Sequence, residues 1–180
     1  MRTRKAFVIA GMWALLVVLA VHFLDFPGSV PDFNRASGGG VLLDAQPAFT
    51  AGGVYERLAG YGEAGRRNYS FRNVTIDVLL PFSVLPFLFL LIRRALARVS
   101  FNPFLTGALL AVPAIYVGFD LLENASVLAL LAQYPERVNL LAWSLGYTTV
   151  VKRAASLLAL VIPLGIFAVQ SVRQRRPHAL

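Results

Sequence analysis

The stretch VGFDLLENA, residues 117–125, places two carboxylates and an amide inside a long apolar run. At helical spacing Asp120, Glu123 and Asn124 share one face, because residues three and four positions apart are neighbours on a helix. Tyr116, four residues before Asp120, extends the same stripe. Charged side chains in such a segment usually face a protein interior or a water-filled cavity. The stretch therefore predicts a membrane-embedded helix that carries a polar site.

Four apolar stretches dominate the chain of 180 residues, of which 57% are hydrophobic. A helix needs about 20 apolar residues to cross the hydrocarbon core of a bilayer. We therefore predict an all-α integral membrane protein with one domain, residues 1–180, built as an antiparallel bundle of four transmembrane helices. We interpret the apolar N-terminus as an uncleaved first span, because no typical cleavage site follows it. The expected spans cover residues of about 6–24, 74–92, 104–131 and 148–169, with a basic tail at 170–180.

The net charge of +8 is concentrated in three clusters that contain no acidic residue. Basic clusters of this kind are typical of the cytoplasmic side of a membrane. Four spans place all three clusters on one side, which predicts cytoplasmic termini and residues 25–72 outside, in a bacterial inner membrane. The expected partners are membrane lipids, with anionic phospholipid at these clusters, rather than nucleic acid. The clusters are Arg2, Arg4 and Lys5; Arg93, Arg94 and Arg98; and Arg173, Arg175 and Arg176.

The outer segment between the first two spans divides into two parts. Residues 26–32 and the glycine run 38–40 are typical of turns and loop. In residues 47–69, apolar side chains recur at helical spacing between charged ones. This pattern predicts an amphipathic extracytoplasmic helix that lies on the bilayer surface or caps the bundle.

Ionisable residues from several stretches are expected at one depth near the outer surface. Asp77 begins an inward-running span, Asp120 and Glu123 end an outward-running one, and Lys152 begins the next inward-running one. Asp77 either lies at the headgroups or faces inward, toward Arg66 or Arg72. We expect a polar pocket that opens to the outer face or laterally to the outer leaflet. Its candidate ligand-binding residues are Arg66, Asp77, Tyr116, Asp120, Glu123, Asn124 and Lys152.

Three functions fit this pocket. The first is binding of a lipid or another amphiphile. The second is catalysis on such a molecule, with Glu123 as acid or base, Lys152 as its charge partner and Asp120 as a further candidate catalytic residue. The third is a scaffold or assembly subunit in which pairs such as Asp120–Lys152 and Glu123–Arg66 only hold spans together.

Chemistry based on a metal or a cofactor has no support in the sequence. The chain has no cysteine, and its two histidines, His22 and His178, are expected on opposite sides of the membrane. No zinc-protease motif, nucleophile elbow or glycine-rich phosphate loop occurs. We therefore predict no metal site and no cofactor, and the sequence predicts no particular oligomeric state.

Three short elements resemble a group of small, uncharacterised four-span bacterial membrane proteins. They are Gly-Arg-x-x-Tyr at residues 65–69, Asp-x-x-Glu-Asn at 120–124 and Thr-x-x-Lys at 149–152. The resemblance covers roughly residues 55–156 and also includes Asp77 followed by Pro81. It implies the four-span architecture and no particular activity, and it adds Tyr69 and Thr149 to the candidate ligand-binding residues.

Overall fold

The computed structural model describes residues 2–174, and this part of the chain is helical with no strand. Four helices are long and apolar enough to cross a membrane, so the prediction of an all-helical chain with four such helices is confirmed. The helices in chain order are α1 (Arg2–Phe23), α2 (Val30–Ala36), α3 (Ala51–Gly60), α4 (Gly62–Val74), α5 (Ile76–Leu96), α6 (Pro103–Gln133) and α7 (Asn139–Gln174).

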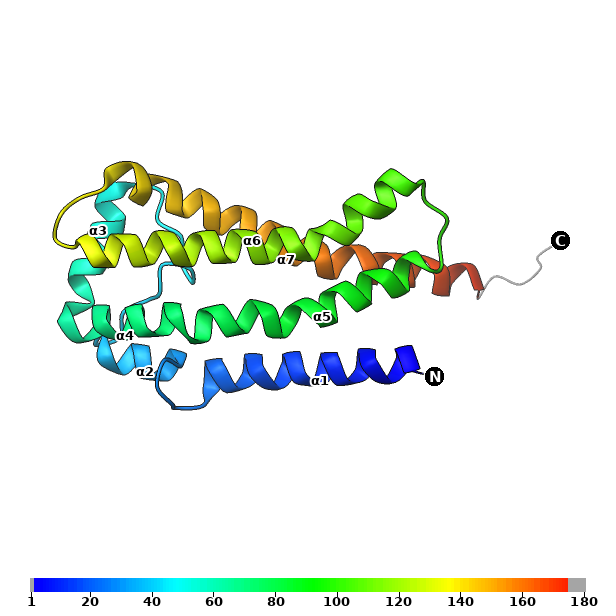
Figure 1. Cartoon of the computed structure of the whole chain (residues 1–180), viewed down its shortest axis with the longest axis horizontal. Helices are drawn as coiled ribbons and strands as arrows, with labels where there is room; N and C mark the ends of the chain where they lie inside the picture. Colours follow the sequence, from blue (N-terminus) through cyan, green and yellow to red (C-terminus); the bar gives the residue numbers. More distant parts are fainter. Residues whose placement is uncertain (1, 175–180) are drawn as a thin grey trace.

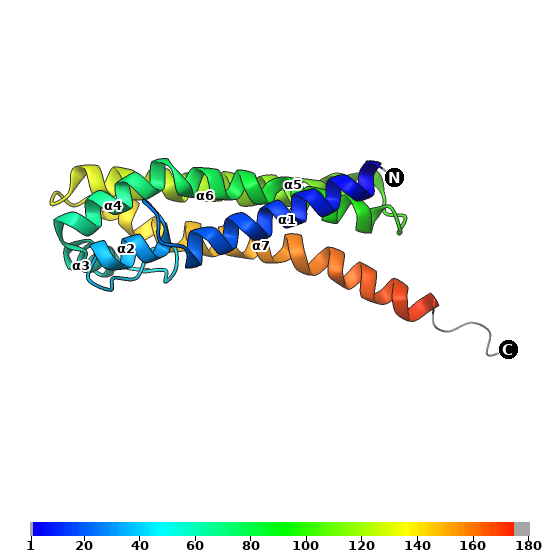
Figure 2. The ribbon, with the colours of Figure 1, turned by 90° about the horizontal axis from the view of Figure 1, so that it is seen from below.

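The long helices α1, α5, α6 and α7 run along the longest dimension of the molecule (Figure 1). Helix α5 packs against α1, α6 and α7, and the most extensive contact joins α6 to α7. The first and last described residues lie at one end, whereas α2, α3 and α4 gather at the other (Figures 1 and 2). This second end also holds an aromatic core in which the rings of Phe33, Tyr61 and Tyr69 contact one another.

Local sequence sets where the helices begin. The Asn102 side chain accepts a hydrogen bond of 2.7 Å from the backbone N–H of Leu105, and Pro103 follows at the first helical position. This cap and proline fix the start of α6 at the expected residue. In the same way Ser29 caps α2 by accepting from the backbone N–H of Asp32 at 3.2 Å. The prediction that residues 26–32 form only turns and loop is therefore wrong, because α2 begins at Val30.

Residues 47–69, for which the sequence predicted one amphipathic helix, contain α3 and most of α4. Gly62 adopts a positive φ of 63°, which interrupts the helix between α3 and α4. Helix α4 then continues into α5 with a second break at Thr75, so that residues 62–96 form one long, interrupted helical segment. Because α4 leads directly into α5, its polar side chains lie at the end of a long apolar helix.

Residues 37–50 connect α2 to α3 without regular structure and pass over the neighbouring helix α7. Leu42 and Leu43 anchor this connecting segment in the core. At the crossing, a Cβ added to Gly146 would overlap the backbone carbonyl of Ala48. Only a glycine on α7 lets the connecting segment approach this closely, and the approach brings Asp44 to the long helices.

Candidate functional site

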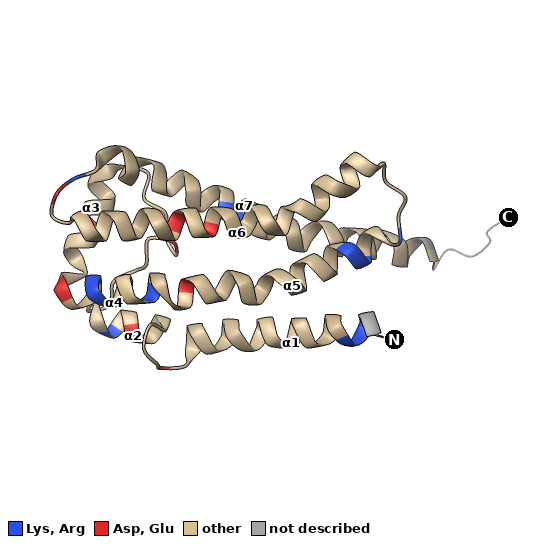
Figure 3. Ribbon diagram, in the orientation of Figure 1, with Lys and Arg blue, Asp and Glu red and all other residues tan. Residues whose placement is uncertain are grey.

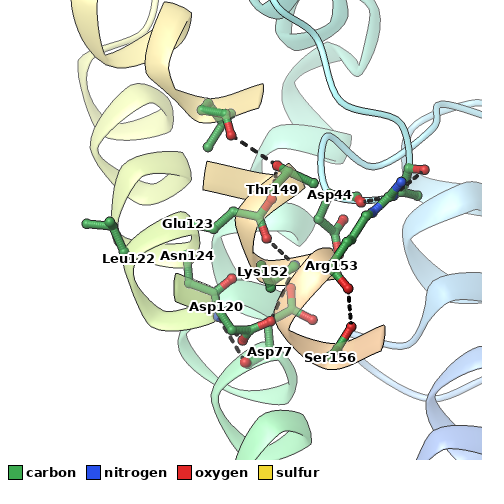
Figure 4. Close-up of polar contacts among 12 residues, drawn as sticks. Asp44, Asp77, Asp120, Leu122, Glu123, Asn124, Thr149, Lys152, Arg153 and Ser156 are labelled. Atoms are coloured by element: carbon green, nitrogen blue, oxygen red, sulfur yellow. Dashed lines mark hydrogen bonds and ion pairs between the residues drawn. The ribbon is translucent and has the colours of Figure 1, made fainter. Parts of the chain in front are cut away.

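Lys152 on α7 lies between two carboxylates from α6 (Figure 4). Its ammonium group contacts the Glu123 carboxylate directly and lies 3.3 Å from Oδ1 of Asp120. Thr149, one helical turn before Lys152, donates its hydroxyl to the other carboxylate oxygen of Glu123. Lys152, Asp120 and Glu123 are all buried, with Glu123 only 1% exposed. The expected meeting of the acidic stripe with Lys152 is present.

Asn124 connects this cluster to α5. Its amide donates a hydrogen bond of 2.9 Å to the backbone carbonyl of Asp77 and a longer one of 3.4 Å to Asp120. Asp77 in turn pairs with Arg72 on α4, at 2.8 Å between its Oδ1 and the guanidinium. Arg72 also donates to the backbone carbonyl of Gly28 at 2.8 Å. A continuous chain of buried polar contacts thus runs from the α1–α2 connection through α4, α5 and α6 to α7.

A cavity of about 370 Å³ lies against these contacts. Its charged and polar walls come from α1, α4, α5, α6, α7 and the connecting segment 37–50, so no single helix forms it. The lining residues are His22, Val30, Leu42, Asp44, Ala45, Arg72, Asp77, Leu80, Tyr116, Asp120, Asn124, Lys152, Arg153 and Ser156.

The rim of the cavity is formed by exposed residues. His22 at the end of α1, Ala45 of the connecting segment and Arg153 of α7 are all exposed and all line the cavity. Arg153 donates to the backbone carbonyls of Asp44 and Ala45, the latter at 2.7 Å (Figure 4). The Arg153 side chain therefore fastens the connecting segment across the mouth of the cavity.

The carboxylate of Asp44 is the unusual group in this wall. Its Oδ1 atom is buried and accepts no hydrogen bond from the described residues. No described cationic side chain lies within ion-pairing distance of it, in contrast to Asp77, Asp120 and Glu123. A buried carboxylate oxygen without a donor is costly, because a folded protein normally supplies a hydrogen-bond partner for such an atom.

The candidate residues predicted from sequence divide into three groups in the structure. Five of them line the cavity, namely Asp77, Tyr116, Asp120, Asn124 and Lys152. Glu123 accepts hydrogen bonds from Lys152 and from Thr149. Neither Glu123 nor Thr149 is part of the cavity wall.

Arg66 and Tyr69 lie away from the cavity. Arg66 donates to the backbone carbonyl of Leu58 at 2.9 Å and lies over the ring of Tyr134, so the considered pair Glu123–Arg66 is not formed. Tyr69 is buried against Phe33 in the aromatic core.

Sequence reasoning did not include Asp44, Arg72 or Arg153 among the site residues. Arg72 was considered as a partner of Asp77, and the structure shows that pair. Arg153, next to Lys152, carried a usable signal because it is a second charge inside the apolar stretch that begins near residue 148. Asp44 carried none, because its position depends on how an irregular segment folds back onto α7.

No three His, Asp or Glu side chains of residues 2–174 are grouped in a way that would hold a metal ion. No known protein family, curated protein or solved structure matches this chain. A small cavity with charged walls, set among apolar helices, is suited to holding the polar part of a molecule whose remainder is apolar.

Proposed function

We propose that this chain is a multi-pass integral membrane protein that binds a lipid or another amphiphile in the polar cavity. The observation that carries the proposal is the cavity of about 370 Å³, whose charged and polar lining residues come from five helices and one connecting segment. The helices around it expose large apolar side chains, for example Met12, Trp13 and Leu16 on α1, as a lipid-facing surface requires. A molecule with a polar head and an apolar tail matches both environments.

In this proposal α1, α5, α6 and α7 cross a bacterial inner membrane as an antiparallel four-helix bundle. The end that holds the first and last described residues carries basic residues and no acidic residue of the described chain (Figure 3). This distribution supports cytoplasmic termini and favours contact with anionic phospholipid there. Helices α3 and α4 then lie on the outer side, where α3 buries Val54, Tyr55 and Leu58 as an amphipathic helix does.

Glu123 has a positioning role in this account. Its carboxylate is enclosed by Thr149 and Lys152 and does not line the cavity, so it holds the ammonium group of Lys152 in place. An acid or base must come within hydrogen-bond reach of the atom that it protonates or deprotonates. The geometry therefore favours binding over catalysis by Glu123.

Filling the cavity tests the proposal. Ser156 lines the cavity on α7 and bonds only to a backbone carbonyl of its own helix, as does the exposed Ser171 further along α7. We expect Ser156→Phe to reduce the amount of co-purifying amphiphile at least several-fold, and Ser171→Phe to leave it unchanged. Mass spectrometry of lipids extracted from the detergent-purified proteins measures this amount. Equal lipid content in the wild type and both variants would overturn the proposal, and so would preferential loss in Ser171→Phe.

A scaffold function predicts a different pattern. If the buried charges only held helices together, Glu123→Gln would lower the stability of the protein without any effect on bound amphiphile beyond that of unfolding. Measuring lipid content and thermal unfolding of the same Glu123→Gln sample separates the two functions.

A further inference from the structure

The charges around the cavity do not balance. Among the residues that line it or contact its lining charges, the acidic side chains are Asp44, Asp77, Asp120 and Glu123, and the cationic ones are Arg72, Lys152 and Arg153. His22 adds an imidazole at the rim. With every carboxylate ionised and the imidazole neutral, these groups carry one net negative charge.

The two buried cations are already committed to the protein. Lys152 serves both Glu123 and Asp120, so a single positive charge is shared by two carboxylates. Arg72 pairs with Asp77 and donates from its other terminal nitrogen to the backbone carbonyl of Gly28, which leaves only its Nε–H without a partner among the described residues. An anionic ligand headgroup would have to compete with these carboxylates for the same donors, and it would add a like charge to a site in excess of negative charge.

Acceptor groups prevail among the cavity groups with spare hydrogen-bonding capacity, beside an unpaired donor, the buried Nε–H of Arg72. Asp44 has no ion-pair or hydrogen-bond partner for its carboxylate among residues 2–174. Asp120 shares Lys152 with Glu123 and lines the cavity, which Glu123 does not. Tyr116 lines the same cavity, and its hydroxyl makes no hydrogen bond within the described chain. These three side chains come from the connecting segment and from two successive turns of α6.

The exposed rim offers a route for a headgroup attached to an apolar chain. Helix α1 packs on α2 and α5, whereas α7 packs on α3, α5 and α6, and the rim residues His22 and Arg153 belong to α1 and α7. The mouth of the cavity thus lies between two helices that have no extensive contact with each other. A tail that leaves through it meets the apolar surfaces of these helices.

We propose that the headgroup held in this cavity is a protonated amine, bound through the carboxylates of Asp44 and Asp120 with the Tyr116 hydroxyl as an additional acceptor. This inference rests on the proposed function and specifies its ligand class. An ammonium group has three donors and one positive charge, which satisfies the unpaired carboxylate and restores charge balance. The ammonium group of an aminophospholipid and that of a single-chain amine both supply this chemistry.

Lipid binding to the full-length protein in detergent tests the inference by native mass spectrometry. The probes are oleylamine, dioleoyl phosphatidylethanolamine and dioleoyl phosphatidylglycerol, and only the binding that Ser156→Phe removes is counted. We expect the wild type to bind oleylamine at least about tenfold more tightly than phosphatidylglycerol, since a hydrogen bond to a charged group contributes that much or more. Binding of phosphatidylethanolamine in the same range would identify an aminophospholipid as a ligand, and binding of oleylamine alone would identify a single-chain amine.

The variants locate the amine. We expect Asp44→Asn to weaken oleylamine binding about tenfold or more and to leave phosphatidylglycerol binding unchanged or tighter. The matched control is Asp25→Asn, because Asp25 is an exposed aspartate outside the cavity. Equal weakening by both substitutions, or no weakening by Asp44→Asn, would overturn the assignment to Asp44.

The comparison of probes on the wild type decides the charge of the headgroup without any variant of Asp44. Tighter binding of phosphatidylglycerol than of oleylamine, removed by Ser156→Phe, would refute the amine while leaving amphiphile binding intact. If Ser156→Phe left the binding of all three probes unchanged, both the inference and the proposed function would be refuted.

Discussion

Replacing Lys152 with methionine is the most informative perturbation of stability, because this one cation is shared by two buried carboxylates. Glu123 is 1% exposed and lies outside the cavity wall, so its carboxylate cannot gain full hydration when the ammonium group is removed. An ordinary interhelical hydrogen bond in a membrane protein contributes about 0.6 kcal/mol on average. Leaving a buried charge without its partner costs more, about 3–5 kcal/mol. We therefore expect Lys152→Met to lower the free energy of unfolding by about 3 kcal/mol or more.

Unfolding in mixed micelles, followed by circular dichroism, measures this loss. Adding Glu123→Gln to Lys152→Met removes one of the unpaired charges and is expected to recover about half of it or more. Arg67→Met is the control, since Arg67 pairs with Glu63 where both side chains are largely exposed, and it should change stability very little. A loss below about 1 kcal/mol for Lys152→Met would refute the reasoning, because it would mean that water reaches the Glu123 carboxylate, which lies outside the cavity wall.

Three further predictions concern the end of the molecule that holds α2, α3 and α4 (Figure 1). Gly146→Ala should destabilise the protein by about 1–3 kcal/mol in thermal unfolding, because the new methyl group overlaps the carbonyl of Ala48; an unchanged melting temperature would contradict this packing. Arg153→Gln should accelerate proteolysis within residues 37–50 with little change in global stability, because it removes the bonds to that segment; equal cleavage rates would contradict the fastening. The backbone N–H of Gly28, helped by Asn68 and Arg35, holds the pKa of Asp32 below its ordinary value of 3.8. Asp32 therefore contributes stability that is full above that value and is lost as the pH falls through the lower folded-state pKa, so Asp32→Asn should reduce the acid sensitivity of unfolding below about pH 4; an unaltered acid transition would contradict it.

Much of the helical architecture was predictable because it follows from composition and spacing. The four apolar runs are each long enough to span a membrane, and each forms a helix. The Asn102–Pro103 pair marks the start of α6 in the sequence. The spacing of Asp120 and Glu123 places them on one face, and a charge one turn into the next apolar stretch is their natural partner. The sequence therefore predicts the contact of both carboxylates with Lys152, and the structure contains it.

The features that the sequence did not predict depend on how the segments without regular structure pack against the helices. Asp44 reaches the cavity because Leu42 and Leu43 are buried and Gly146 admits the connecting segment, and no periodic pattern encodes such an approach. Helix α2 was missed because glycine and proline dominate the residues before it, whereas the Ser29 cap decides the structure. Arg66 was expected near the acidic stripe, but the ring of Tyr134 offers its guanidinium a closer partner.

The central claim is that a polar cavity exists among lipid-facing helices, and thiol labelling tests it most directly because the chain has no cysteine of its own. Tyr116 lines the cavity, and its neighbour Ile115 lies on the outside of α6 at nearly the same height, 45% exposed. In intact membranes a charged, water-soluble thiol reagent should modify the Tyr116→Cys variant and leave the Ile115→Cys variant unmodified, because the thiolate that reacts forms only where water is present. Labelling of Ile115→Cys alone, or equal labelling of both variants, would contradict the account.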